Sequence, residues 1–144
     1  MRQRGFTLLE ALLSVAIITI LAGMSVPLYI RFQQMQDLDA ATQKLVGDLR
    51  QAALYSRNGY RDSVWSVHIA SGSITLFMGG TYSGHNTAYD ETDAISSAIS
   101  LSGSSDVTFG KLYGQPTGDT ASITLSRANI SKTVTVNTYG MVNF

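Results

Sequence analysis

The sequence contains no cysteine and only two prolines in 144 residues. The lack of cysteine excludes disulfide bonds and thiolate metal sites, so a domain outside the cytoplasm must be held together by its core alone. Ten Lys and Arg residues balance ten Asp and Glu residues, and charged residues make up only 14% of the chain. This balance gives no sign of a polybasic tail or of a protein that binds nucleic acid through a basic surface.

Sequence motifs of catalysis are missing as well. The chain has no Gly-x-Ser-x-Gly, no phosphate-binding loop and no base placed to activate a serine, so we expect no enzyme, no cofactor and no catalytic residue. The two histidines, His68 and His85, have no second ligand at metal-binding spacing, and no metal site is expected there. Asp90, Glu91 and Asp93 cluster in one segment that could offer oxygen ligands to calcium, but the EF-hand pattern is absent and a solvated loop is the simpler interpretation.

One long apolar segment stands near the N-terminus. Residues 6–30 are almost wholly apolar, and a helix needs about 20 such residues to cross a bilayer core. Arg2 and Arg4 precede the segment, and the positive-inside rule then keeps the N-terminus in the cytoplasm and sends the rest across. Pro27 is tolerated in a membrane helix, where it should loosen or kink the helix around residues 23–27.

A single carboxylate, Glu10, interrupts the apolar segment. A charge inside a bilayer is costly, and such residues usually have a function and a nearby partner; a hydrated position close to the interface is the alternative. The segment itself could be a cleaved secretory signal peptide, but it is long and no small-x-small cleavage site follows it. An ordinary signal anchor would explain the span and its orientation without explaining Glu10. A third possibility gives Glu10 a specific role.

The residues around Glu10 resemble the class III signal of type IV pilin-like proteins. A short basic leader precedes GFTLLE at residues 5–10, a long apolar helix follows, and Pro27 falls where these helices commonly carry a proline. The resemblance implies that a prepilin peptidase cleaves between Gly5 and Phe6 and methylates the new N-terminus at Phe6. It also implies that Glu10 of one subunit neutralises the Phe6 amine of a neighbour in the filament. Such a pair recovers much of the cost of burying two charges and favours one axial register.

Residues 31–58 are predicted to continue the helix with an amphipathic pattern. Apolar and small residues recur there at steps of three and four, which is a helical stripe that we expect to face a core. The stripe consists of Phe32, Met35, Leu38, Thr42, Leu45, Leu49, Ala52 and Ser56. We expect Asn58-Gly59 to end the helix. One helix of roughly 50 residues, from about Thr7 to Arg57, would be about 75 Å long.

Residues 59–144 are predicted to form a β-rich globular head. A β-hairpin is expected between Trp65 and Met78, with its turn at Ser71-Gly72. Three more strands are expected in DVTFG (106–110), ASITLS (121–126) and KTVTVNTYGMVNF (132–144), while residues 81–105 approach low complexity and are treated as a loop. A long helix followed by antiparallel strands indicates an α+β fold in which the helix covers one face of a sheet.

The head resembles the GspH/FimT branch of pilin-like proteins, which comprises minor pseudopilins and minor pilins. The matching features are an early strand with Trp65, VTF at 107–109 followed by Gly114, ITL at 123–125, and VTV at 134–136 followed by Gly140 and Val142. The resemblance implies a minor subunit of a type II secretion or type IV pilus system. Such a subunit is held in the inner (cytoplasmic) membrane with its head outside the cytoplasm, and its partners are the prepilin peptidase and other pilin or pseudopilin subunits.

Two alternatives remain. Minor pilins of the FimT type are linked to DNA uptake through basic residues near the end of the head, where this chain has few. A DNA receptor would need a basic patch assembled in space from Arg57, Arg61, Lys111, Arg127 and Lys132, so we do not expect nucleic acid as a partner. The second alternative is a plain membrane-tethered domain with no role in a filament, in which Gly5 would stay uncut.

Overall fold

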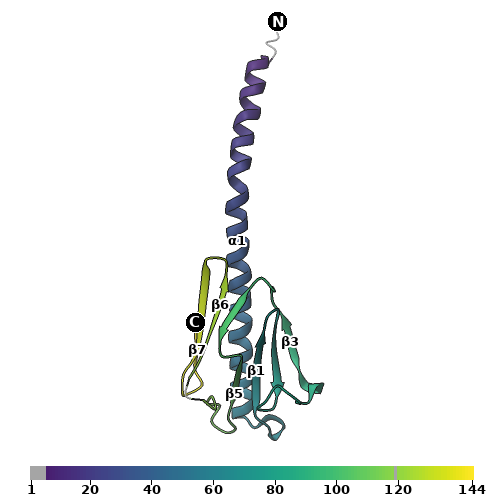
Figure 1. The fold of residues 1–144 in the computed structure, drawn as a ribbon, viewed down its shortest axis with the longest axis vertical. Helices are drawn as coiled ribbons and strands as arrows, with labels where there is room; N and C mark the ends of the chain where they lie inside the picture. The colour runs from purple at the N-terminus through teal and green to yellow at the C-terminus, as the bar shows by residue number, and fades with distance from the viewer. Residues whose placement is uncertain (1–5, 119) are drawn as a thin grey trace. The chain divides into compact units, whose positions relative to one another are not determined.

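A computed structural model describes residues 6–118 and 120–144, and it has the predicted α+β architecture (Figure 1). The chain divides into two compact units, Met1–Gln34 and Met35–Phe144, which we describe separately. Helix α1 (Leu8–Arg57) supplies the first unit and the opening segment of the second. The elements after α1 are, in chain order, η1 (Tyr60–Asp62), β1 (Trp65–Ala70), β2 (Ser73–Met78), η2 (Thr87–Tyr89), β3 (Glu91–Ala94), β4 (Ser100–Gly103), β5 (Asp106–Phe109), β6 (Ala121–Arg127), β7 (Ile130–Val136) and β8 (Val142–Asn143).

The limits of α1 match the sequence prediction. Pro27 lies inside the helix, which continues through it without a break. At the other end, the N–H of Asn58 donates to the Leu54 carbonyl at 3.0 Å, and Gly59 then takes a φ of 62°. A left-handed residue directly after a helix is the usual stop, and glycine adopts it without the steric cost of a Cβ atom. The predicted stop at Asn58-Gly59 is therefore confirmed.

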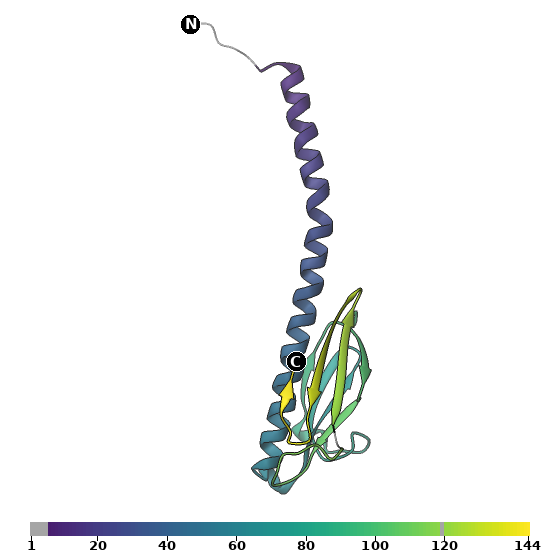
Figure 2. The same cartoon turned by 90° about the vertical axis from the view of Figure 1, so that its left-hand side faces the viewer.

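The second unit contains two antiparallel sheets. Their strand orders are β3-β2-β1-β5 and β4-β6-β7-β8. The strands lie beside the C-terminal part of α1 (Figure 2). The predicted hairpin is β1 and β2, and the three further strands predicted from the sequence are β5, β6 and β7. The last of these segments also supplies β8, which pairs with β7 after a turn. The sequence predicts one sheet, and the second arises because β4 pairs with β6 whereas β5 pairs with β1.

Strands β3 and β4 fall in residues 81–105, which the sequence predicts to be a loop. Glu91–Ala94 pairs with β2, and Ser100–Gly103 pairs with β6. Both strands are short and mostly exposed, so their side chains show no alternation between apolar and polar residues. They are β-strands because they pair with β2 and β6, and this pairing between distant residues cannot be recognised from the local sequence.

The core of the second unit lies between α1 and the two sheets. Leu38, Leu45 and Leu49 of α1 are fully buried in one cluster with strand residues such as Val67 and Leu125. Thr42, Ala52 and Ser56 from the predicted stripe are buried too. The stripe prediction is wrong for Phe32 and Met35, which are 59% and 45% exposed. The buried face begins at Leu38, so the helical period in the sequence starts before there is a core for it to face.

A buried serine joins the end of α1 to the first strand. The Trp65 backbone N–H donates to the Ser56 Oγ at 2.8 Å, and the Trp65 indole N–H donates to the Tyr60 carbonyl at 3.1 Å. The Trp65 ring also packs against Tyr55 and Tyr60, with ring centroids 4.8 and 5.5 Å away. These contacts fix the path of the chain from the helix into β1, and they satisfy polar groups that would otherwise be buried without partners.

Candidate functional site

The first described residues form the start of α1. The N–H of Glu10 donates to the Thr7 carbonyl at 3.1 Å and to the Thr7 Oγ1 at 3.3 Å. Thr7 is therefore the residue that caps the helix, and Glu10 stands three residues after it. The spacing Thr-x-x-Glu is that of a capping box, and this signal for a helix start is present in the sequence although it did not enter the sequence-based prediction. Gly5 lies outside the described residues, and Phe6 precedes the helix with an exposed side chain.

Glu10 is exposed in the first turn of α1, and its carboxylate has no partner among residues 6–118 and 120–144. The N-terminal end of a helix dipole favours a negative charge at this position. No other charged residue stands on the helix between Glu10 and Arg31, and most of the residues between them are apolar. A membrane around this turn would leave the carboxylate in a medium where a lone charge is costly, so it needs a partner from outside the chain.

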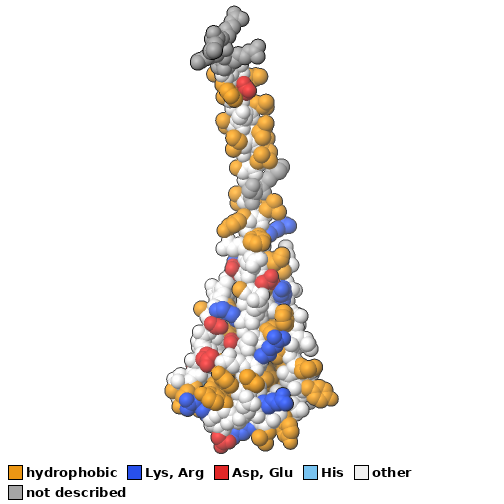
Figure 3. All heavy atoms as spheres, turned by 180° about the vertical axis from the view of Figure 1, so that it is seen from behind, with side chains coloured by type: hydrophobic (Ala, Val, Ile, Leu, Met, Phe, Trp, Pro, Cys, Tyr) orange, Lys and Arg blue, Asp and Glu red, His pale blue; other side chains and the backbone are white. Residues whose placement is uncertain are grey.

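The described surface of the first unit around Glu10 is largely hydrophobic. Every described large apolar side chain from Phe6 to Phe32 is at least 47% exposed. Figure 3 shows these side chains along the N-terminal part of α1, whereas charged side chains gather on the second unit. This helix is long and apolar enough to cross a membrane. An exposed apolar surface of this extent marks contact with a membrane or with other protein chains.

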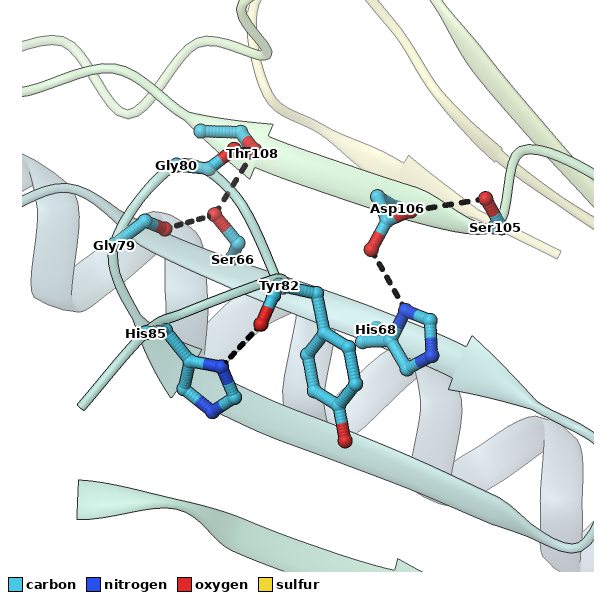
Figure 4. Close-up of polar contacts among 9 residues, drawn as sticks. All are labelled: Ser66, His68, Gly79, Gly80, Tyr82, His85, Ser105, Asp106 and Thr108. Atoms are coloured by element: carbon cyan, nitrogen blue, oxygen red, sulfur yellow. Dashed lines mark hydrogen bonds and ion pairs between the residues drawn. The ribbon is translucent and has the colours of Figure 1, made fainter. Parts of the chain in front are cut away.

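The two histidines hold a loop onto the outer face of the first sheet (Figure 4). The His68 ring stacks on Tyr82 at 3.7 Å between centroids, and its Nδ1 lies 2.7 Å from a carboxylate oxygen of Asp106. The His85 ring stacks on the other side of Tyr82 at 4.7 Å, and its Nε2 lies 2.8 Å from Asp90. The His85 side chain is only 7% exposed, so it is a structural element of the loop between β2 and β3.

This arrangement perturbs the proton affinity of one histidine. The hydrogen bond from His85 to the Asp90 carboxylate, with a second to the Tyr82 carbonyl, raises the pKa of His85 above its usual value. Each histidine is held by a different carboxylate, and Tyr82 separates the two rings. The two histidines therefore do not form a common binding site.

The acidic segment that we considered for calcium is divided among separate partners. Asp90 contacts His85, Glu91 accepts a hydrogen bond from the Gln51 amide at 3.1 Å, and Asp93 pairs with Lys44 at 3.2 Å. Within residues 6–118 and 120–144, no group of three His, Cys, Asp or Glu side chains is placed to hold a metal ion.

The basic residues proposed for a DNA-binding patch are also divided among partners. Arg127 pairs with Asp37, Lys132 pairs with Asp39, and Lys111 pairs with Asp62 at 2.8 Å. The hydrogen bond from Lys111 lowers the pKa of Asp62. Arg61 lies over the Tyr89 ring, 4.0 Å from its centroid. Of the five cations, only Arg57 has no polar or aromatic partner in the described part of the chain. Phosphate contact would therefore compete with contacts that already exist.

Comparison with known proteins identifies one family feature. Residues 1–26 match the family described as the prokaryotic N-terminal methylation motif. No curated protein and no solved structure matches the chain. The match covers the apolar segment with Glu10 and supports a type IV pilin-like protein that is processed by prepilin peptidase and assembles as pilins do. Together with the apolar helix, it indicates anchoring in a membrane.

Proposed function

We propose that this protein is a minor subunit of a type IV filament, either a type II secretion pseudopilus or a type IV pilus. Its leader would be cut between Gly5 and Phe6, and Phe6 would be methylated at its new amine. The chain would act as a substrate of processing and as a building block, not as an enzyme. The GspH/FimT-like strand motifs of the head favour the minor class.

The observation that carries this proposal is the Glu10 carboxylate, exposed and without a partner on an apolar helix surface in the described chain. Cleavage after Gly5 would create a positive amine four residues before it. In one chain Phe6 lies before the helix and Glu10 is the third residue of the helix, and we propose that the amine pairs with the carboxylate of a neighbouring subunit. Pairing between chains removes two lone charges from a low-dielectric medium and penalises any axial slip that would separate them.

Before assembly, the protein would be held in the inner membrane, which the basic leader and the apolar helix favour. The basic leader would stay in the cytoplasm, residues 6–30 would span the bilayer, and residues 59–144 would form the head outside the cytoplasm. Residues 31–58 would join the span to the head. The head would then face sibling subunits or secreted cargo once the subunit has left the membrane.

The first test is the intact mass of the protein from membranes of cells that carry a prepilin peptidase. We expect the loss of residues 1–5 and the gain of one methyl group. An uncut chain would contradict the proposal and leave a plain membrane-tethered domain.

A matched pair of variants separates the two physical roles of Glu10. Glu10→Gln keeps a side chain that is compatible with a capping box but removes the charge, whereas Ser14→Ala changes a neighbouring polar residue and leaves the charge in place. We expect Glu10→Gln to be cut normally and to be lost from sheared filaments, while Ser14→Ala is incorporated. Equal incorporation of both variants would refute the ion pair as the assembly device.

DNA uptake is the second candidate function, and it makes a different prediction. A head that binds DNA should retard a duplex at low salt and release it as salt rises, because phosphate contacts displace counterions. Arg57→Glu should then weaken binding, since Arg57 is the one cation of the five that is free to contact a phosphate in the described chain. No retardation at low salt would remove this candidate.

A further inference from the structure

The chain changes from one sheet to the other between two adjacent residues. The Ser104 N–H donates to the Ser122 carbonyl of β6 at 3.1 Å. The carbonyl of the following residue, Ser105, accepts a hydrogen bond from the Ile69 N–H of β1 at 2.8 Å. The chain thus leaves β6 and joins β1 at this point. On the β4 side of the change, the sheet has no further strand among the described residues, so β4 is an edge.

A cavity of about 390 Å³ lies where the two sheets separate. We call it the inter-sheet notch. It is lined by Ile69 and Ser71 at the end of β1, by residues 100–105, and by Ile123 of β6. Among these described lining residues there is no charged and no aromatic side chain; they are serines, aliphatic residues and one glycine. The notch therefore offers hydroxyl and backbone groups along with apolar surface.

The register of β4 shows which backbone groups face the notch. Bonded and non-bonded pairs alternate along an antiparallel ladder. Because Ser104 is bonded to Ser122, the pair Ser102 and Thr124, two residues along, is also bonded, and the next pair, Leu101 and Leu125, is not. The N–H and C=O of Leu101 therefore point away from β6, toward the open side of β4. No partner for them is found in residues 6–118 or 120–144.

The other edges in the described chain are better protected than β4. Edge β3 carries two charges, Glu91 and Asp93. Edge β5 is covered by the segment that follows it, through the bridge between Phe109 and Pro116 and a 2.8 Å hydrogen bond from Thr117. Edge β8 is only two residues long. Charges, prolines, covering loops and short length are the devices that keep edge strands from pairing, and β4 has only its short length.

We propose that the inter-sheet notch receives an extended, uncharged strand from a neighbouring subunit, which pairs with the outer edge of β4. Strand rise, strand spacing and sheet spacing together give roughly 160 Å³ per residue, so the cavity accommodates two to three residues. The donated strand would bond to the Leu101 backbone, and small or aliphatic side chains would fill the space beside Ile69 and Ile123. This inference rests on the proposed function, because a neighbouring subunit is present only in an assembled filament.

Hydrogen exchange tests the inference on the full chain. The Leu101 amide should exchange freely in the detergent-solubilised subunit and at least about tenfold more slowly in the assembled filament. The Ser102 amide, which is bonded to β6 in both states, is the internal control. An unchanged Leu101 amide in an incorporated subunit would overturn the proposal.

A photo-cross-linking residue at Ser102 identifies the occupant in cells that express the sibling subunits. We expect a cross-linked peptide from another subunit, within a segment free of charged residues. A cross-link to lipid, to nucleic acid or to secreted cargo, or the lack of any cross-link in an incorporated subunit, would contradict this occupant.

Two variants at one position test the backbone contact itself. Leu101→Pro removes an N–H that β6 does not use, and edge strands tolerate proline where the N–H faces outward. Leu101→Ala keeps that N–H and removes most of the side chain. The Ser102 cross-link should disappear in the first variant and persist in the second. Thermal melting followed by Trp65 fluorescence shows whether both variants fold. If the proline variant does not fold, hydrogen exchange at the Leu101 amide of the unaltered chain tests the proposal instead.

The mass of the same filament sample distinguishes the two possible failures. An uncut leader would refute the proposed function and, with it, the subunit that is meant to occupy the notch. A cut, methylated and incorporated chain whose Leu101 amide still exchanges freely would refute the notch alone.

Discussion

Asp48 is the residue whose charge opposes folding most clearly. It lies on α1, outside the segment that we assign to the membrane, and its side chain is partly buried next to β3. Its Oδ2 atom is buried without a hydrogen-bond partner in the described chain. Burial, with repulsion from Asp93 and Glu91, raises the pKa of Asp48 to about 6, although Lys44 acts in the opposite direction. The variant Asp48→Asn removes the charge and keeps the size.

The sign of the effect follows from the direction of the shift. The pKa of Asp48 rises from 3.8 to about 6 on folding, so the folded chain holds the proton more tightly. The stability this gives is fully present below pH 3.8 and is lost as the pH rises through about 6. Each pKa unit corresponds to about 1.4 kcal/mol, which sets an upper limit of about 3 kcal/mol. Because the side chain is only partly buried, solvent screening reduces this to about 1–2 kcal/mol.

Urea unfolding of the full chain in detergent, followed by the fluorescence of its one tryptophan, measures this effect. At pH 7.5 we expect Asp48→Asn to be more stable than the parent by about 1–2 kcal/mol. At pH 4.5 the difference should be markedly smaller, and it should vanish below pH 3.8, where the carboxyl is protonated in both the folded and the unfolded chain. Asp62→Asn, at a fully exposed carboxylate, should leave the pH dependence between these values in place. The reasoning would be refuted by two results together. The parent chain would be no less stable at pH 7.5 than at pH 4.5, and Asp48→Asn would have the same free energy of unfolding as the parent at both pH values.

Three further changes test other parts of the head by the same unfolding assay. Ser56→Ala leaves the buried Trp65 N–H without its acceptor and should cost about 1–3 kcal/mol, with a shifted tryptophan emission in the folded state. Gly140→Ala places a Cβ atom 2.1 Å from a carbonyl oxygen at a φ of 77° and should cost at least about 1–3 kcal/mol. The same change at Gly118, where nothing lies within 4 Å, should be nearly neutral. His85→Gln should abolish the part of the stability that is present below pH 6.5 and is lost as the pH rises through the raised pKa of that histidine.

The helix could be predicted from the sequence because its signals are local. The apolar run, the step of three and four from Leu38 to Ser56, and the stop at Gly59 each depend on residues within a few turns of one another. Phe32 and Met35 show where this reasoning fails, since the period extends beyond the core that gives it meaning. Periodicity tells which face of a helix is apolar, and only the tertiary structure tells what covers that face.

The second sheet could not be predicted from the sequence because it depends on contacts between distant residues. Leu101 lies opposite Leu125 in the strand pairing, and the Ile69 N–H donates to the Ser105 carbonyl. The serine-rich sequence around residue 100 suggests neither partner. The pairs formed by Lys44 and Asp93, and by Arg127 and Asp37, are equally invisible in a chain whose charges look evenly scattered. Pairs of this kind engage cations that a DNA-binding function would require, and the sequence alone does not show that these cations have partners.

The start of α1 shows how one short motif can serve folding and function together. Thr7 and Glu10 have the spacing of a capping box, so the acid has a local reason to stand in the first turn of any helix, soluble or not. That reason would apply only while Glu10 is near water, because a membrane makes the lone charge costly. The proposed new amine on a neighbouring chain would change the balance, since it would turn the same carboxylate into half of an ion pair. Helix initiation therefore places the acid at the third residue of the helix, and the proposed assembly would give it a partner at a fixed height along the filament.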